Sequence, residues 1–396
     1  MDRRKFLKKS SLASSLFFVP SFVKAFEQVA SASLGYKRLV IIQLSGGNDG
    51  LNTIIPYNND IYYKERPTIN ISKSDVIKLT DEVGLNPSLT PLKRLYDQGY
   101  LSIINNVGYP NPVRSHFRSM DIWQTATDSD KFSQSGWLGR YLDNYGKNPY
   151  SAIEVDESLS LAMKGETVNA IATKDPRAFH NLSRDPYFRN IQKHQNDTHL
   201  SEHNLGYLYK SMIDAHSSAK YIYETSKTVS TTQEYPKNLF GKQLKTTAQF
   251  INSGLDTKVF YTSLNGFDTH ANQLNTQKRL LKQYADGIEA FVKDLKKNET
   301  FKDTLILTFS EFGRRVKQNA SVGTDHGTAN NVFIIGENLK KKGFYNKMAN
   351  LSDLDDNGDL KFEIDFRTIY ATVLDKWLEV DDKKVLNKSF SQLDFI

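Results

Sequence analysis

The chain has 396 residues, a formal net charge of +7 and no cysteine. The lack of cysteine excludes disulfide bridges, thiolate zinc sites and cysteine nucleophiles, so burial must hold the fold, with or without a metal. The first 25 residues hold six basic side chains against one acidic side chain, a net of +5, which leaves about +2 for the rest. So small a charge leaves no electrostatic footprint for nucleic acid, and we expect no nucleic-acid partner.

The N-terminus has the features of an export signal. Arg3–Lys8 contains an arginine pair, a lysine, Phe-Leu and a second lysine, which is the core of a twin-arginine signal. The apolar stretch Leu12–Val23 is too short and too polar to span a bilayer, and small residues that suit cleavage follow it. We therefore predict a signal peptide and spacer over residues 1–33, recognition by the twin-arginine export machinery, and a periplasmic or extracellular protein. No later segment is long and apolar enough for a transmembrane helix.

The rest of the chain, residues 34–396, alternates between strand and helix patterns. Five apolar runs of strand length end at turn residues, and helical patterns such as Gln273–Leu295 lie between some of them. This alternation predicts a single α/β domain with a doubly wound, mainly parallel sheet and helices on both faces. The segment from about 150 to 256 is polar and mostly helical in pattern, so we expect a helical cap or insertion there. The predicted strands are Lys37–Leu44, Leu101–Val107, Lys258–Ser263, Thr304–Phe309 and Asn331–Gly336.

Polar groups follow the first two predicted strands, and in this class of fold ligands gather at the carboxyl ends of strands. Asp49, in a Gly-rich loop after the first strand, would either bind a cation or belong to a turn. Ser115 stands at the start of a predicted helix after the second strand, where its hydroxyl is either a helix cap or a nucleophile. Arg114 and Arg118 beside it would either clamp an anion or lie on the surface.

The loops around the last three strands carry carboxylates and imidazoles. Asp268 and His270 follow the third strand, Glu311 follows the fourth, and Asp325 and His326 precede the fifth. The predicted topology would bring these loops to one edge of the sheet. Ligands of this kind without thiols suit zinc, manganese or iron.

One further stretch has the spacing of a calcium-binding loop. Asp353–Asp359 resembles the start of an EF-hand, but the twelfth position is Ile364, where a bidentate glutamate is required. Glu363 and Asp365 lie one residue to either side. We therefore expect a polar turn between short strands at this place.

Four of these motifs together resemble the exported proteins catalogued as "domain of unknown function 1501". They are Gln43–Asn52, Gly266–His270, Ser310–Arg314 and Gly323–Asn330, and the closing Asp365–Thr372 also fits. The resemblance covers essentially the whole chain after the signal. It implies a fold similar to the alkaline phosphatase and sulfatase superfamily, whereas the family name itself supplies no chemistry.

The likeness to alkaline phosphatases implies roles for several residues. It implies that His270 and His326 are metal ligands and that Ser115 occupies the place of the nucleophile. Asp268 matches a ligand aspartate, although its spacing from His270 is shorter than the superfamily's.

Two departures from the superfamily's pattern limit what the likeness implies. Glu311 can replace the aspartate of an Asp-His pair at a strand end, but Phe312 cannot replace the histidine. This implies one complete metal site rather than two. A standard sulfatase is disfavoured, because cysteine is absent and Ser115–Arg118 does not fit the motif in which sulfatases mature their nucleophile.

The resulting hypothesis is an exported hydrolase of phosphate or sulfate esters that depends on a divalent metal, zinc or manganese. Its substrate would be an anionic small molecule or a glycan ester. The alternative is a non-catalytic exported binding or assembly protein with the same fold and a degraded site, which the departure at Phe312 favours. The predicted catalytic residues are Ser115 and Arg118, and the predicted metal ligands or their neighbours are Asp49, Asp268, His270, Glu311, Asp325 and His326.

Overall fold

The structure is a computed structural model that describes residues 36–186 and 203–396, with the side chains from residue 213 onward in the second range. The predicted signal peptide lies outside the described residues.

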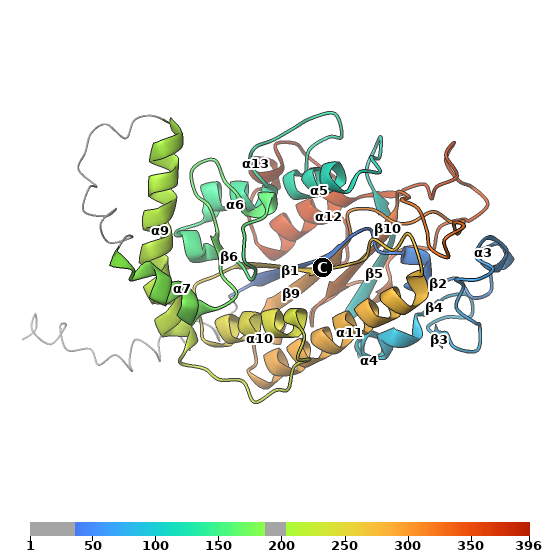
Figure 1. Cartoon of the computed structure of the whole chain (residues 1–396), viewed down its shortest axis with the longest axis horizontal. Coiled ribbons are helices and arrows are strands. Elements are labelled where there is room, and N and C mark those ends of the chain that lie inside the picture. Colours follow the sequence, from blue (N-terminus) through green and yellow to red (C-terminus); the bar gives the residue numbers. More distant parts are fainter. Residues whose placement is uncertain (1–35, 187–202) are drawn as a thin grey trace, which may run out of the picture.

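A nine-stranded sheet runs through the centre of the described chain (Figure 1), in the order β11-β5-β10-β9-β1-β8-β6-β7 with β12 also paired to β5. β1 (Arg38–Ser45) pairs in parallel with β8 (Val259–Asn265) and with β9 (Thr304–Phe309). β10 (Asn330–Ile335) is antiparallel to both β9 and β5 (Leu101–Gly108). Because two reversals restore the direction, β5 runs the same way as β1, β8 and β9.

Four short strands extend this sheet. They are β6 (Ala152–Glu154), β7 (Ile171–Ala172), β11 (Gly343–Phe344) and β12 (Ile364–Asp365), each parallel to its neighbour. The segment 150–256 was expected to be a mostly helical cap, yet β6 and β7 within it form one edge of the sheet.

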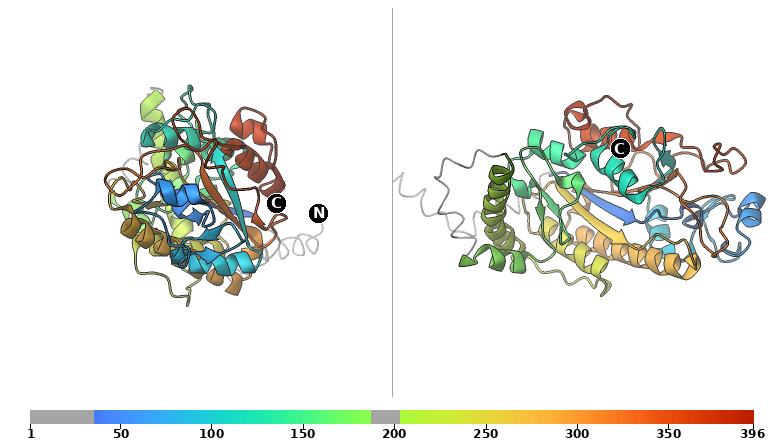
Figure 2. Two further views of the ribbon diagram at one scale, coloured as in Figure 1. Left: turned by 90° about the vertical axis from the view of Figure 1, so that its right-hand side faces the viewer. Right: turned by 45° about the horizontal axis from the view of Figure 1, so that its top comes forward.

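Both faces of the sheet are buried under helices, which confirms the predicted α/β class with a mainly parallel sheet. Leu39 and Ile41 of β1 pack in one core and Val40, Ile42 and Leu44 in the other, because successive side chains of a strand point to opposite faces. Figures 1 and 2 show the two helical layers with the sheet between them. One layer contains α5 (His116–Thr125), α6 (Trp137–Tyr145), α12 (Phe366–Thr372) and α13 (Asp382–Leu386), and the other contains α4 (Thr90–Asp97), α10 (Leu239–Asn252) and α11 (Gln273–Lys297).

The remaining elements lie at the two ends of the sheet (Figure 1). At one end, a three-stranded sheet with its own small core includes Leu51, Ile55 and Tyr62. At the other end, two further helices pack against each other. The small sheet consists of β2 (Ile54–Ile55), β4 (Gly84–Leu85) and β3 (Ile77–Lys78) beside α3 (Asp60–Glu65), and the two helices are α7 (Pro176–Ser183) and α9 (His203–Ser226).

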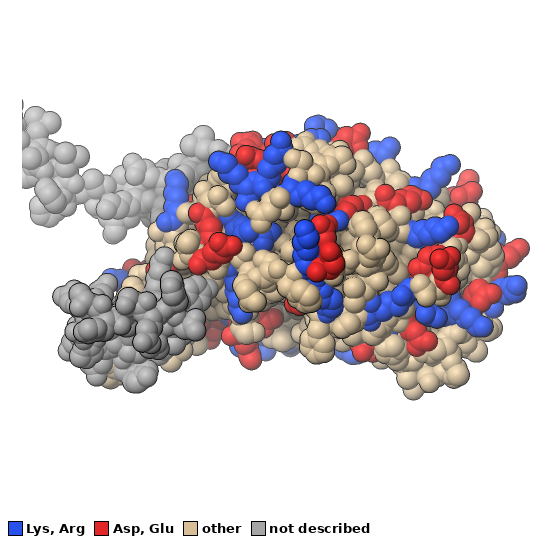
Figure 3. Space-filling view, turned by 90° about the horizontal axis from the view of Figure 1, so that it is seen from above, with Lys and Arg blue, Asp and Glu red and all other residues tan. Residues whose placement is uncertain are grey.

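The surface carries charges of both signs. Figure 3 shows basic and acidic side chains interspersed over the face that α5, α6 and α12 form. Within the described ranges, every helix is too short or too polar to cross a bilayer.

The topology places five loops at one edge of the sheet. β1, β5, β8 and β9 all end there, and the antiparallel β10 begins there. The loops that follow or precede these strands carry the side chains that the sequence analysis singled out.

Candidate metal centre

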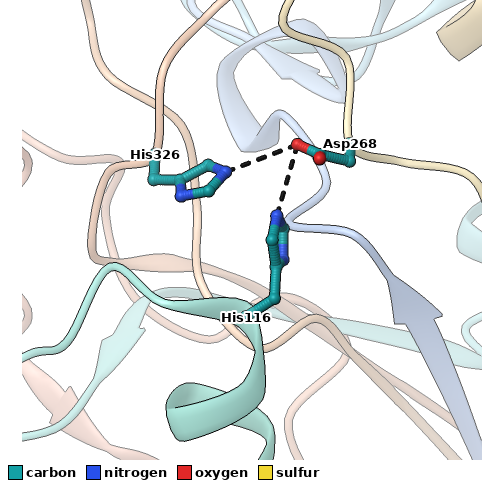
Figure 4. Close-up of side chains that lie close together, drawn as sticks. All are labelled: His116, Asp268 and His326. Carbon is teal, nitrogen blue, oxygen red and sulfur yellow. Dashed lines mark hydrogen bonds and ion pairs between the residues drawn. The ribbon is translucent and has the colours of Figure 1, made fainter.

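Three imidazoles converge on one carboxylate oxygen at this edge. The Nε2 atoms of His116, His270 and His326 lie 3.3, 3.1 and 3.4 Å from Oδ1 of Asp268. The Nε2 atoms of His270 and His326 lie 2.8 Å apart. Figure 4 shows His116 at the start of α5 and His326 in the loop before β10, both pointing toward Asp268. Four side chains from three separate loops therefore meet at one point.

The other ring nitrogen of each imidazole is held by an acceptor. Nδ1 of His116 lies 2.9 Å from Oε1 of Glu311, and Nδ1 of His326 lies 2.7 Å from the backbone oxygen of Arg114. Nδ1 of His270 lies 3.3 Å from Oδ1 of Asp325. Because a carboxylate or carbonyl oxygen can only accept, each Nδ1 carries the hydrogen. Each Nε2 is therefore the atom free to bind a proton or a metal ion, the arrangement typical of metal-ligating histidines.

The spacing of these donor atoms fits a metal ion. In a tetrahedral zinc site with bonds of roughly 2.0–2.1 Å, neighbouring donor atoms lie roughly 3.3 Å apart. The distances from Asp268 to His116 and His326 are 3.3 and 3.4 Å, and the donor atoms of all three residues lie within 4.8 Å of one another. Nε2 of His116 is buried and has no hydrogen-bond partner among the described residues. A cation would satisfy this buried nitrogen and relieve the repulsion between the converging lone pairs.

The electrostatics of the cluster also favour a cation. Burial alone would raise the pKa of Asp268, but the hydrogen bond and charge of Arg314 lower this pKa to about 2, so the carboxylate is ionised. The hydrogen bond to Glu311 raises the pKa of His116, whereas burial lowers the pKa of His326. The three ligand atoms thus comprise one anionic oxygen and two nitrogens whose free positions face it.

Arg314 fixes the loop that carries Asp268. Its Nη2 lies 2.8 Å from Oδ1 of Asp268, and its side chain is fully buried. Its other N–H groups donate to the backbone oxygens of Gly47 and Thr324, at 2.6 and 2.8 Å. Gly46 makes this packing possible, because with its φ of +117° a side chain would meet the backbone nitrogen of Asp268 at 2.4 Å.

Glu311 and Asp325, predicted as ligands or neighbours, lie behind the imidazoles. Oε1 of the fully buried Glu311 accepts from Nδ1 of His116 and, at 2.8 Å, from the backbone N–H of Gly46. Oδ1 of Asp325 faces His270 and accepts from Asn319 at 3.1 Å. Both carboxylates therefore orient imidazoles and do not face the converging nitrogens.

Asp49 is not part of the cluster. Its side chain is fully buried and forms an ion pair of 2.6 Å with Arg66. It also accepts from the side chain of Gln273 and, at 3.1 Å, from the backbone N–H of Leu51, where it caps a short 3₁₀ turn. Because these contacts occupy both oxygens, we leave Asp49 out of the proposed ligand set.

The two predicted catalytic residues have other surroundings. Ser115 is exposed at the N-cap of α5, and its hydroxyl makes no capping hydrogen bond. Arg118 turns away from the cluster: it donates to the backbone oxygens of Ser129, at 2.9 Å, and Lys131, and its guanidinium lies 3.8 Å from the ring centre of Phe132. Neither residue contacts the four converging side chains in the part of the chain that the structure describes.

His116 was not among the residues predicted from the sequence. It is the first residue of α5, between Ser115 and Arg118, and those two neighbours were assigned because they matched the expectation of a nucleophile and an anion clamp. The available signal was its position: each of the other ligand loops brings a histidine or carboxylate to a strand end, and His116 is the equivalent residue after β5.

Comparison with known proteins places the chain in a family without assigning a reaction. No curated protein matches the sequence. Similar solved structures include the PsFucS1 sulfatase from Pseudoalteromonas sp., with 12% identity, a TM-score of 0.39, and coverage of 94% of this chain and 74% of that chain. Another is the phosphonate monoester hydrolase SpPMH from Silicibacter pomeroyi, with 9% identity, a TM-score of 0.36, and coverage of 78% and 69%. A likeness of this degree carries no activity over to this chain. The family described as "Protein of unknown function (DUF1501)" matches residues 99–390, and the chain belongs to this family, as its motifs predicted.

Proposed function

We propose that the chain is an exported hydrolase of phosphate or sulfate esters that works with a single divalent metal ion, zinc or manganese. The observation that supports it is the convergence of Nε2 of His116, Nε2 of His326 and Oδ1 of Asp268, each held from behind by a second group. Three protein ligands leave a position open for water or substrate, as in catalytic zinc sites. An ion held there supplies Lewis-acid activation of water and neutralises charge on the ester.

His270 is suited to move the proton. Its Nε2 lies 2.8 Å from that of His326, which is closer than the roughly 3.3 Å between neighbouring ligands of one tetrahedral ion. We therefore assign it beside the ligand set, with Asp325 behind it as the orienting carboxylate. Nε2 of His270 would accept a proton from the attacking water and return it to the leaving alcohol. Water thus adds hydroxyl to the acid and a proton to the alcohol as the ester bond breaks.

This assignment replaces the predicted roles of Ser115 and Arg118. Among the described residues, Arg114, Arg118, Arg314 and Arg315 are each engaged with other groups, Arg315 in an ion pair of 3.6 Å with Asp359. Arg314 binds Asp268 and backbone oxygens, Arg114 binds Asp359, and Arg118 binds the loop at Ser129. The charge of the ester would therefore be met by the ion itself, and the nucleophile would be water.

The same engagement of the arginines favours a second candidate, a non-catalytic exported protein that holds a metal ion for binding or assembly. In that case the ion would be structural or would bind a partner's carboxylate or phosphate. Metal binding alone does not separate the two functions, so the experiment must measure hydrolysis as well.

The test uses the folded, metal-loaded chain. Metal analysis should find about one divalent ion per chain, and a panel of phosphate and sulfate esters should include a substrate. His116→Ala and Asp268→Asn should each lose metal and hydrolysis together, whereas His180→Ala, at a histidine stacked on Tyr223 in the helical end of the molecule, should keep both. A protein that binds metal and hydrolyses no ester would support the second candidate, and a metal-free folded protein would overturn the proposal.

Export is a separate part of the proposal and rests on the N-terminal sequence. Replacing the arginine pair, Arg3→Lys with Arg4→Lys, should keep the chain in the cytoplasm, because twin-arginine export depends on these two side chains. Cell fractionation measures this directly. Unchanged export of the double variant would contradict the assignment of the pathway.

A further inference from the structure

A cavity of about 300 Å³ lies next to the metal centre, under the turn that resembles an EF-hand. Its wall is mainly apolar and comes from four parts of the chain, one of which contains Glu311 and Phe312. The apolar lining residues are Tyr109, Val113, Phe312, Ala329, Leu360 and Phe362.

Phe312 joins this cavity to the metal centre. Its ring lines the cavity, and its centre lies 4.8 Å from the imidazole of His116 and 4.7 Å from that of His326. Glu311, which lines the cavity as well, holds Nδ1 of His116. The cavity is therefore one side chain away from two of the proposed ligands.

The charges around the cavity disfavour an anionic occupant. Glu311 and Asp355 are the carboxylates in its wall, and Lys361 is the cation. Lys361 forms an ion pair with Asp353, so its charge is already matched. Asp355 is paired with Arg114 at 3.5 Å and Glu311 bonds to His116. The lining residues therefore offer no unmatched cation to an anionic group, whereas a neutral apolar group would meet carbon on most sides.

The volume of the cavity limits the size of the group that it can bind. A cavity of roughly 150 Å³ lined by apolar side chains is enough to bind benzene. The volume of about 300 Å³ therefore holds one aromatic ring with a substituent, or a short branched alkyl group. It lies at the lower limit of small-molecule pockets, which span roughly 300–1,000 Å³.

Hydrogen bonds and an ion pair fix the two segments that form much of the cavity wall. Arg114, in the loop that carries Val113, donates through Nε to Oδ2 of Asp359 at 2.7 Å, and Asp359 is fully buried. Leu354 and Leu360 form a backbone bridge that closes the turn above the cavity. The loop 109–115 and the turn 353–360, which both line the cavity, are thus held together.

We infer that this cavity binds the neutral aryl or short alkyl group of the ester whose charged group is held at the metal centre. The inference rests on the proposed function for the identity of the ester, while the binding of an apolar group can be measured without any hydrolysis. It assigns a substrate class: phosphate monoesters or diesters, or sulfate monoesters, with one compact apolar substituent, in preference to esters of polar alcohols.

Binding is tested on the metal-loaded chain with p-cresol, a neutral one-ring probe, by titration calorimetry. myo-Inositol, a polar ring of similar size, is the comparison and should not bind. Val113→Phe and Ala329→Leu fill the cavity from two sides, and each should weaken p-cresol binding by at least about tenfold with unchanged metal content. Leu182→Phe, an enlargement at an exposed position of α7, should leave the affinity unchanged.

Two outcomes would overturn the inference: no binding of p-cresol to the wild-type chain, or equal affinity in both folded cavity-filling variants. Hydrolysis separates the inference from the proposed function. If p-cresol binds and both fillings block it while no ester is cleaved, the cavity assignment holds and the catalytic proposal fails. If phenyl phosphate is cleaved and its KM is the same in wild type and both variants, the catalytic proposal holds and the cavity assignment fails.

Discussion

Glu311 offers the sharpest test of the metal centre, because it touches a proposed ligand without being one. Its Oε1 accepts from Nδ1 of His116 at 2.9 Å and from the backbone N–H of Gly46 at 2.8 Å. Glu311→Ala removes a charge-assisted hydrogen bond worth roughly 1.5–3 kcal/mol, which predicts a metal Kd higher by a factor of roughly 10 to 100. Glu311→Gln is the milder variant. Because His116 and Gly46 bond to the same oxygen, an amide oxygen can replace it. The charge is lost, and the amide nitrogen then faces Oγ of Ser310, which lies 3.3 Å from Oε2, so the expected factor is about three to ten.

The assay is a competition titration with a chromophoric chelator at fixed pH, with the melting temperature of each metal-free variant as the measure of folding. Glu157→Ala is the matched control, since Glu157 is an acidic residue in an exposed ion pair with Lys174, far along the chain from the proposed ligands. Its metal Kd should equal that of the wild type. An unchanged Kd for Glu311→Ala in a folded protein would show that His116 is not a ligand and would refute the reasoning.

Two further variants test the metal centre, and a third tests the effect of a buried carboxyl on stability. Asp359→Asn weakens the hold on Arg114, whose backbone oxygen fixes His326, so the metal Kd measured by chelator competition should rise several-fold. Asp325→Asn should lower kcat by at least about tenfold with unchanged metal content, because it removes the carboxylate behind His270, the proposed proton acceptor. If the variant lost metal in proportion to activity, His270 would be a ligand. Burial raises the pKa of Glu154 from 4.5 to about 7. The contribution of this carboxyl to the free energy of unfolding is therefore fully present below about pH 4.5 and is lost as the pH rises through 7. Glu154→Gln should therefore stabilise the protein by about 3 kcal/mol at pH 8 and by little at pH 4, as measured by urea unfolding.

The long central strands could be predicted because continuous apolar runs of this length suit a strand that is buried on both faces of a sheet. β9 spans Thr304–Phe309 as predicted, and β1 spans Arg38–Ser45, within one residue of the prediction at each end. Both are buried on both faces, which produces continuous apolar runs. The same double burial hides direction, so no feature of the run at Asn330–Ile335 indicates that it is antiparallel. β6 and β7, with three and two residues, are too short to show any period.

The sequence was sufficient to predict which loops form the candidate metal centre, but not which residue in each loop is a ligand. Asp49 and Asp268 both follow buried strands in Gly-containing loops, and their sequences do not distinguish them. What separates them is a partner. Arg66 and Gln273 enclose Asp49, whereas Oδ1 of Asp268 accepts from Arg314 and also faces three imidazoles. Partners that are distant in sequence are contributed by tertiary packing, which spacing within one loop cannot reveal.

Phe312 links the number of metal ions to the choice of substrate. The resemblance to alkaline phosphatases implied a histidine at this position, and the phenylalanine implied one metal site rather than two. In the structure the ring packs against His116 and His326 and lines the apolar cavity. A phenylalanine cannot coordinate an ion, and its ring excludes water from the side of the two imidazoles that it covers. Under the proposed function, Phe312 would therefore both take the place of a ligand for a second ion and supply part of the wall for a neutral group. A site with one ion has less charge with which to hold a doubly charged ester, so binding energy from an apolar substituent becomes the more valuable contribution.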